Sequence, residues 1–264
     1  MRSLPDLQVK TIPNGWLSVD RSTQVYARGF GELVKVPIWC TAIVGGAKKI
    51  IVDTGIHDRG WVDEHIAPCS QAPEERIDRA LKDIVGWSCA DVEIVINTHL
   101  HYDHCGGNSF FPEAIFYIQA AEWDFSQRPV ATQNDFYQEF LIGRERIAFF
   151  RWKFVDGIHD VIPGVRVFPT PGHTPGHQSV AVRTRDGVVV IAGDCANCRE
   201  NLTDEVPVGI VYDTAVEIES LRRIKKIADL VIPGHDPEIE PASAGLELLT
   251  RLKHMERENT GVAD

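Results

Sequence analysis

Four residues whose side chains bind metal ions lie within six positions of the chain, directly after a short apolar run. They are His99, His101, Asp103 and His104. The preceding run, 92–96, is rich in β-branched residues and bounded by polar ones, which predicts a buried strand. The ligands therefore follow the carboxyl end of a strand, where α/β proteins place their chemistry. Imidazole and carboxylate together suit zinc, with iron or manganese as alternatives.

The spacing within this stretch favours two metal ions over one. In an extended segment His99 and His101 project to the same side, because they are two residues apart. Asp103 and His104 can then turn toward a second position. A solvated polar loop is the alternative, but only 10 of the 264 residues are histidine. Three of them in six positions, together with an aspartate, therefore indicate a metal site.

The same local pattern recurs three times further along the chain: an apolar run, then glycine or proline, then a possible ligand. His173 lies in a turn-rich segment after the strand-like run 165–168. Asp194 ends the apolar run 188–193, and His235 closes another such run. One such residue alone is more often an ordinary turn or surface group. Three in the same context, downstream of the cluster, indicate that they complete one metal centre.

Taken together, these residues make the sequence resemble the metallo-β-lactamase superfamily. The match consists of the His-x-His-x-Asp-His motif at 99–104, the three later ligands, and Asp53, where the family keeps an aspartate near the metal loop. It extends from about Val36 to about Pro237. The resemblance implies an αββα sandwich, in which two mixed sheets pack face to face with helices on the outer faces.

The resemblance also implies how the ligands divide between two zinc ions. One ion would be held by His99, His101 and His173. The second would be held by Asp103, His104 and His235, with Asp194 bridging the two ions. Asp53 is expected to orient a ligand histidine by accepting its second ring N–H, as carboxylates around metal sites do. A strand-end turn aspartate is the alternative for that position.

Within the superfamily, the sequence is most similar to the N-acyl-homoserine lactonases, in segments 31–40, 172–179 and 205–207. One position departs from that group. Three residues after the bridging aspartate those lactonases carry a tyrosine that hydrogen-bonds the substrate carbonyl, and this chain has Asn197. An amide N–H can still donate to an oxyanion. The departure puts the preference for acyl-homoserine lactones in question and leaves hydrolysis intact.

The predicted activity is the opening of a lactone ring by a dinuclear zinc hydrolase. Two cations about 3.5–4 Å apart lower the pKa of a shared water, so that a bridging hydroxide can attack the carbonyl. Asp103 is the candidate to pass the proton to the leaving oxygen, and Asn197 is the candidate oxyanion donor. The alternatives are hydrolysis of another ester, amide or phosphate ester bond at the same site, or an iron-dependent oxygenase on the same fold.

Length and composition agree with one soluble α/β domain over residues 1–264, with a core of about 36–237. An N-terminal arm is expected over 1–35 and a closing helix over 242–257. The formal charge of −11 argues against a nucleic-acid partner. No apolar run approaches the ~18 residues of a membrane helix, and no signal peptide is evident. A small-molecule substrate, a cytoplasmic location and a monomer or homodimer are therefore expected.

The other expectations concern elements and cysteines. Helical spacing predicts amphipathic helices over 74–87 and 213–229, and a hairpin turn is expected at 184–187. The aromatic-rich segment 123–158 is either a core-packing helix or a wall of the substrate pocket, with the loops around Trp16 and Trp61 as weaker pocket candidates. Six cysteines show no framework spacing apart from one C-x-x-C at 195–198, which favours free thiols.

Overall fold

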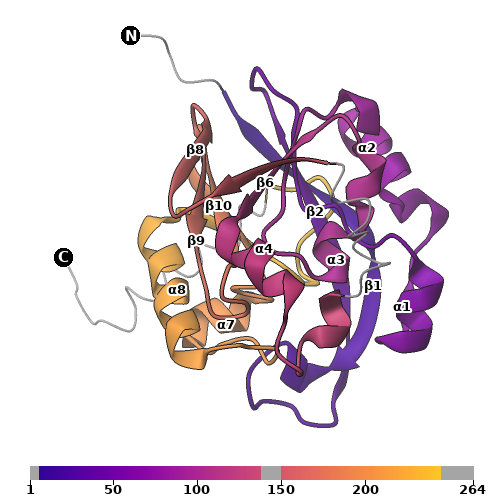
Figure 1. The fold of residues 1–264 in the computed structure, drawn as a ribbon, viewed down its shortest axis with the longest axis vertical. Helices are drawn as coiled ribbons and strands as arrows, with labels where there is room; N and C mark the ends of the chain where they lie inside the picture. The colour runs from indigo at the N-terminus through magenta and orange to yellow at the C-terminus, as the bar shows by residue number, and fades with distance from the viewer. Residues whose placement is uncertain (1–5, 138–149, 245–264) are drawn as a thin grey trace.

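Two mixed β-sheets form the centre of the molecule in the computed structural model, which describes residues 6–137 and 150–244 (Figure 1). The first sheet has seven strands in the order β4 (Cys69–Ser70), β1 (Gln8–Asp20), β2 (Leu33–Val44), β3 (Ile50–Val52), β5 (Ile94–Ile96), β6 (Ile115–Gln119) and β7 (Arg151–Val155). The second has five strands in the order β12 (Leu230–Pro233), β11 (Gly187–Gly193), β10 (Gln178–Thr184), β9 (Val165–Pro169) and β8 (His159–Ile162).

Helices flank the two sheets, and the short α3 (Tyr102–Cys105) carries two of the candidate ligands. The other helices are α1 (Arg59–His65), α2 (Ile77–Val85), α4 (Ala120–Gln127), α7 (Arg199–Asp204) and α8 (Thr214–Ile227). In Figure 1, α1 and α2 lie at the right and α7 and α8 at the left, with the strands between them. The predicted αββα sandwich of two mixed sheets is therefore confirmed, as are the helices expected at α2 and α8.

Alternation along the short central strands explains how the first sheet is covered on both faces. Ile50 and Val52 of β3 pack in one cluster with residues of the second sheet, such as Val180. Ile51, between them, points the other way and packs with Leu81 of α2. Successive side chains of a strand point to opposite faces, so a short all-apolar run must be covered twice. Each buried aliphatic side chain contributes roughly 1.5–3 kcal/mol.

Strand direction determines where the functional loops emerge. In the first sheet β3, β5, β6 and β7 run parallel to one another, whereas β1 and β2 are antiparallel neighbours. The carboxyl ends of β3 and β5 therefore lie at the same edge of the sheet, side by side. In the second sheet β11 and β12 are parallel. The segments after these four strands carry most of the predicted ligands.

The N-terminal region differs from expectation. Within the segment 1–35, where an N-terminal arm is expected, residues 8–20 form β1, which pairs with β2 inside the first sheet. The hairpin is confirmed, with Thr184 paired to Gly187. The helix expected over 242–257 falls almost entirely outside the described residues. Among the described residues, no helix combines the length and apolar character needed to cross a membrane.

Candidate metal centre

The loop after β5 is held in place by Asp53, which follows β3. Asp53 accepts the backbone N–H of Thr98 (2.7 Å) through one carboxylate oxygen and the Thr98 hydroxyl (2.8 Å) through the other. The backbone of Asp53 is left-handed, with φ of 57°, which aspartate tolerates better than most residues. Asn97 also stabilises this loop, because its side-chain amide donates to the carbonyl of His104 (3.1 Å). Hydrogen bonds within the protein therefore hold the backbone of the His-x-His-x-Asp-His segment in position.

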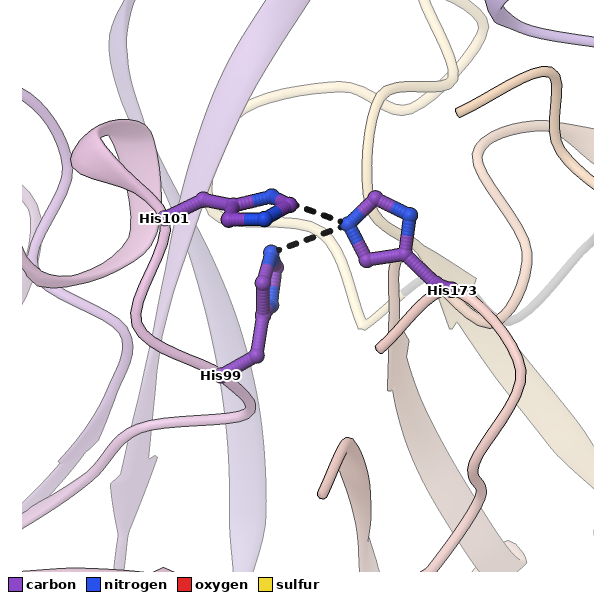
Figure 2. Close-up of side chains that lie close together, drawn as sticks. All are labelled: His99, His101 and His173. Atoms are coloured by element: carbon purple, nitrogen blue, oxygen red, sulfur yellow. Dashed lines mark hydrogen bonds between the residues drawn. The ribbon is translucent and has the colours of Figure 1, made fainter. Parts of the chain in front are cut away.

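Three histidines converge on one point and form the first ligand group. His173 Nε2 lies 3.2 Å from His99 Nε2 and 3.0 Å from His101 Nδ1 (Figure 2). His99 and His101 come from the loop after β5, in the first sheet, and His173 comes from the loop after β9, in the second. All three side chains are buried. They form a triad that could hold a metal ion.

Asp103, His104 and His235 form a second ligand group beside the first. Asp103 Oδ2 lies 3.8 Å from His104 Nε2 and 3.7 Å from His235 Nε2. Asp194 lies between the two groups. Its Oδ1 is 3.0 Å from His104 Nε2, and its Oδ2 is 3.6 Å from His173 Nε2. All seven predicted ligand residues therefore meet at one place, with Asp194 in reach of both groups.

In three of the ligand histidines, the ring nitrogen that faces away from the cluster determines which tautomer the ring adopts. His104 Nδ1 donates to Asp53 Oδ2 (2.8 Å), His173 Nδ1 to the carbonyl of Ile210 (2.5 Å), and His235 Nδ1 to the carbonyl of Pro37 (2.8 Å). A proton on Nδ1 leaves the Nε2 lone pair free and aimed at the cluster, which is the usual arrangement of a metal-bound histidine.

The cluster also contains buried polar atoms that a cation would satisfy. Within the described part of the chain, the buried His104 Nε2 and Asp194 Oδ1 face each other at 3.0 Å, and neither makes a well-formed hydrogen bond. Buried polar atoms are normally paired in good geometry, so a nitrogen and a carboxylate oxygen that face each other in a ligand cluster fit a shared metal ion. The imidazole and carboxylate donors are those that zinc takes in hydrolases. The residues present therefore fit a pair of divalent ions.

Electrostatics differ between the two groups. Burial lowers the pKa of His99, His101 and His173, so their rings are neutral at pH 7, as metal ligands must be. Burial also acts to lower the pKa of His104, but the carboxylates of Asp194, Asp103 and Asp53 outweigh it and raise that pKa. The carboxylates around His104 therefore make the second group favourable for positive charge.

A cavity of about 150 Å³ opens onto both groups. Its wall combines ligands with apolar and amide side chains, including Leu17, Val36, Ile66, Phe136, Ile210 and Asn197. A second cleft of about 570 Å³ adjoins it, and the two share Gln24, Val36 and His235. The predicted oxyanion donor, Asn197, lies in the wall, and its buried Oδ1 has no hydrogen-bond partner among the described residues.

The aromatic segment 123–158 divides between the two roles predicted for it. Trp123 packs against Trp152, with ring centroids 5.4 Å apart, as a core role requires. Phe136 instead lines the cavity. Residues 138–149, which include part of the helix expected here, lie outside the described residues.

The remaining candidates have structural surroundings. Trp16 lies in β1, where its indole donates to Glu75 (3.0 Å), and Trp61 stacks on His65 in α1. Neither is among the residues that line the cavity. All six cysteines are free thiols, as predicted.

His177, which the sequence does not single out as a metal ligand, holds Asp194 in position. Its Nε2 accepts the backbone N–H of Asp194 (3.1 Å), and its Nδ1 lies 2.9 Å from the Thr170 hydroxyl. Burial lowers the pKa of His177 to about 3, so the ring stays neutral and able to accept. The sequence offers one indication of this role, which is the position of His177 in the same turn-rich segment as His173. The roles of the Pro37 and Ile210 carbonyls cannot be predicted in this way, because every residue has a backbone carbonyl.

Comparison with known proteins agrees with this geometry. The family described as the metallo-beta-lactamase superfamily matches residues 33–235. The N-acyl homoserine lactonase of Bacillus cereus is 32% identical over 243 residues, which cover 87% of this chain and 93% of that protein. The lactonase AiiA of Bacillus thuringiensis subsp. kurstaki is also 32% identical, over 244 residues with the same coverage.

Solved structures give the same result. An N-acyl homoserine lactone hydrolase with the product N-hexanoyl-L-homoserine at its catalytic metal center has a TM-score of 0.77 and 29% identity, covering 89% of this chain and 95% of that one. The dizinc quorum-quenching lactonase AidC shares the fold, with a TM-score of 0.69 at 17% identity and coverage of 89% and 90%. The family match and the relatives above 30% identity confirm the predicted resemblance, and the chain belongs to the metallo-β-lactamase superfamily.

Proposed function

We propose that this protein is a dinuclear zinc hydrolase that opens the ring of a lactone. The observation that carries the proposal is the pair of buried ligand groups with Asp194 between them. The reaction class is supported by relatives named N-acyl homoserine lactonase and by a similar structure that holds N-hexanoyl-L-homoserine at its metal center. Iron or manganese could replace zinc, since the same donors bind all three.

Asp103 is the residue we assign to proton transfer. When bound, two divalent ions supply a water that loses its proton near neutral pH and stabilise charge on the reacting oxygens. The Asp103 carboxylate lines the cavity, and its Oδ2 lies within 4 Å of both His104 Nε2 and His235 Nε2. It is placed to hold a proton and deliver it to the alkoxide oxygen that leaves when the ring opens.

Asn197 is the residue we assign to the substrate carbonyl. Its side chain lines the same cavity as Asp103, His101 and Asp194. An amide N–H directed at the carbonyl oxygen stabilises the negative charge that develops there during attack. The amide is shorter than the phenol that the lactonase group carries at this position, so the carbonyl must approach more closely. We expect this difference to affect the choice of lactone.

The two cavities indicate the kind of substrate. The cavity beside the ligands is small and largely apolar, which suits the lactone ring itself. The adjoining cleft is lined by apolar residues such as Val25 and Val34 and by charged residues such as Lys35 and Arg199, and it has room for a substituent on the ring. The substrate we propose is therefore a small lactone with one substituent.

The experiment that tests this function is acid release in weakly buffered solution over a panel of lactones. The panel contains acyl-homoserine lactones of several chain lengths, γ-butyrolactone and aromatic lactones. The protein is loaded with zinc, and its metal content is measured beforehand. The control is Asp194→Asn, which keeps the shape of the bridging side chain and removes its charge.

We expect zinc-dependent acid release on at least one lactone and little on any with Asp194→Asn. The chain-length profile then shows which substituents the adjoining cleft accepts. Protein that carries two zinc ions and turns over no lactone in the panel would overturn the lactonase assignment. The metal centre would then serve the hydrolysis of another bond.

A further inference from the structure

Glu122, in the first turn of α4, is a buried carboxylate outside both ligand groups. Its side chain has no solvent exposure. One oxygen accepts the backbone N–H of Leu100 (3.0 Å) and the hydroxyl of Tyr137 (2.6 Å), and the other accepts the hydroxyl of Thr174 (2.5 Å). The backbone N–H of Gly176 is a fourth donor. A buried carboxyl group with this many donors is well satisfied, and losing it would take an acceptor away from all four donors.

The donors to Glu122 belong to the segments that carry the first ligand group. Leu100 lies between His99 and His101, and Thr174 directly follows His173. The first segment extends from β5 in the seven-stranded sheet, and the second extends from β9 in the five-stranded sheet. One carboxylate therefore binds both segments at the place where their histidines must converge.

Packing around Glu122 leaves little room for either segment to shift. A Cβ at Gly176 would lie 1.9 Å from the backbone nitrogen of Glu122, so the segment after His173 rests directly on α4. Tyr137, another donor to Glu122, packs edge to face against His101, with the two ring centroids 4.6 Å apart. Close packing of this kind transmits small displacements, because interiors have few voids.

We propose that Glu122 is a positioning residue for the first ligand group, and that it sets the affinity of that group for its metal ion with little effect on the second. The inference rests on the two-metal centre proposed above. None of the Glu122 contacts reaches Asp103, His104 or His235 among the contacts described, whereas both segments of the first group depend on it. Outer contacts of this importance typically change metal affinity about 10- to 100-fold.

The test measures zinc affinity by competition with a chromophoric chelator in two backgrounds. His235→Ala leaves the first group intact, and His173→Ala leaves the second. Glu122→Gln is introduced into each, because the amide keeps the shape of the side chain while its nitrogen accepts no hydrogen bond. The cobalt(II) absorption spectrum of the first group is a second readout, since it reports ligand geometry.

The matched control is Asp236→Asn. Asp236 is equally buried, and its carboxylate accepts the backbone N–H groups of Arg199 and Glu238, both at 2.8 Å. It lies next to His235 and away from the first group. Loss of a buried carboxyl group in general would therefore affect both variants, whereas the proposed role affects Glu122→Gln alone at the first group.

We expect Glu122→Gln to lower zinc affinity at least about tenfold in the His235→Ala background and to leave it within about twofold in the His173→Ala background. Equal losses in the two backgrounds, or none in the first, would overturn the inference. If the wild-type protein fails to bind two zinc ions, the proposed function fails instead. Should Glu122→Gln not fold, Tyr137→Phe and Thr174→Val each remove one bond, and no selective loss in either also overturns the inference.

Discussion

The carboxylate of Asp53 connects the end of β3 to His104 and Thr98 at 2.7–2.8 Å. Asparagine adopts the left-handed backbone of this position readily, so Asp53→Asn changes the charge and keeps the turn. We expect zinc affinity at the second ligand group to fall about 10- to 100-fold, because the His104 ring loses its charged acceptor. Chelator competition measures this. Asp58→Asn, at the exposed start of α1, is the control and should leave affinity unchanged.

Asn197 is tested by its effect on turnover at constant metal content. Asn197→Ala removes the amide that we assign to the carbonyl oxygen, and loss of such a donor typically lowers kcat about 100-fold or more. Two zinc ions should still bind, because Asn197 belongs to neither ligand group. Asn197→Tyr should shift relative rates toward acyl-homoserine lactones. Unchanged kcat in Asn197→Ala, with both metals present, would contradict the assignment.

At the residue scale, side-chain identity decided what sequence could predict. The seven candidate ligands could be predicted because their types are uncommon and their positions follow strand ends. The position of His177 near His173 can be read from the sequence, but its hydrogen bond from the Asp194 backbone N–H depends on the fold. Glu122 carried no signal at all, since a glutamate in the first turn of a helix is ordinary. The partners that donate from Tyr137, Leu100 and Thr174 lie 15, 22 and 52 positions away in the chain.

At the element scale, the turn after β9 is confined by α8. Gly172 has φ of 142°, and a Cβ there would lie 2.2 Å from the Cβ of Glu217. Gly172→Ala should therefore suffer both backbone strain and overpacking, the latter worth roughly 1–3 kcal/mol. Gly157→Ala is the matched control, because Gly157 also has positive φ and meets no atom within 4 Å.

Urea denaturation of the two glycine variants measures this difference. We expect Gly172→Ala to lose more free energy of unfolding than Gly157→Ala, by roughly 1–3 kcal/mol. Equal losses would mean that the turn can move away from α8, which contradicts the packing described.

The elements themselves were predictable where periodicity is clear. Apolar residues at helical spacing predict the helices α2 and α8, and compact β-branched runs predict the short central strands. β1 was missed because Pro13 and Gly15 interrupt it, and both residues normally argue against a strand interior. The structure accommodates them with an irregularity in pairing between Pro13 and Trp16. Residues 8–20 form a strand because they pair with β2, and pairing with a separate segment cannot be predicted from the local sequence pattern.

At the scale of the whole molecule, the buried carboxyl of Glu217 makes stability depend on pH. Burial raises the pKa of Glu217 from 4.5 to about 9, and its Oε1 accepts the N–H of Val208. The folded protein therefore keeps a proton that the unfolded chain releases above pH 4.5. The contribution is complete below that pH and is lost as pH rises toward 9.

Glu217→Gln tests this sign, because the amide is neutral at every pH. We expect the Tm of Glu217→Gln, relative to wild type, to rise steadily between pH 5 and pH 9. Thermal unfolding followed by circular dichroism at several pH values measures the difference. A difference that stays constant, or one that falls with pH, would contradict a neutral buried carboxyl.

The arrangement of the whole molecule explains why the candidate metal centre lies where loops from the two sheets meet. The first sheet supplies the motif after β5, and the second supplies His173, Asp194 and His235 after β9, β11 and β12. The sandwich could be predicted through family resemblance, whereas the course of the loops that shape the cavity could not. Those loops are positioned by contacts between distant segments, such as Phe136 beside the ligands. Substrate choice depends on them.

The measurement that tests the central claim most directly is a zinc titration of the metal-free protein. Acid release is followed on the lactone that the panel shows to be turned over fastest. If both ligand groups serve one reaction, activity should appear as the second equivalent of zinc binds and should stop rising at two equivalents. Full activity with one equivalent bound, or none with two, would contradict a dinuclear lactonase.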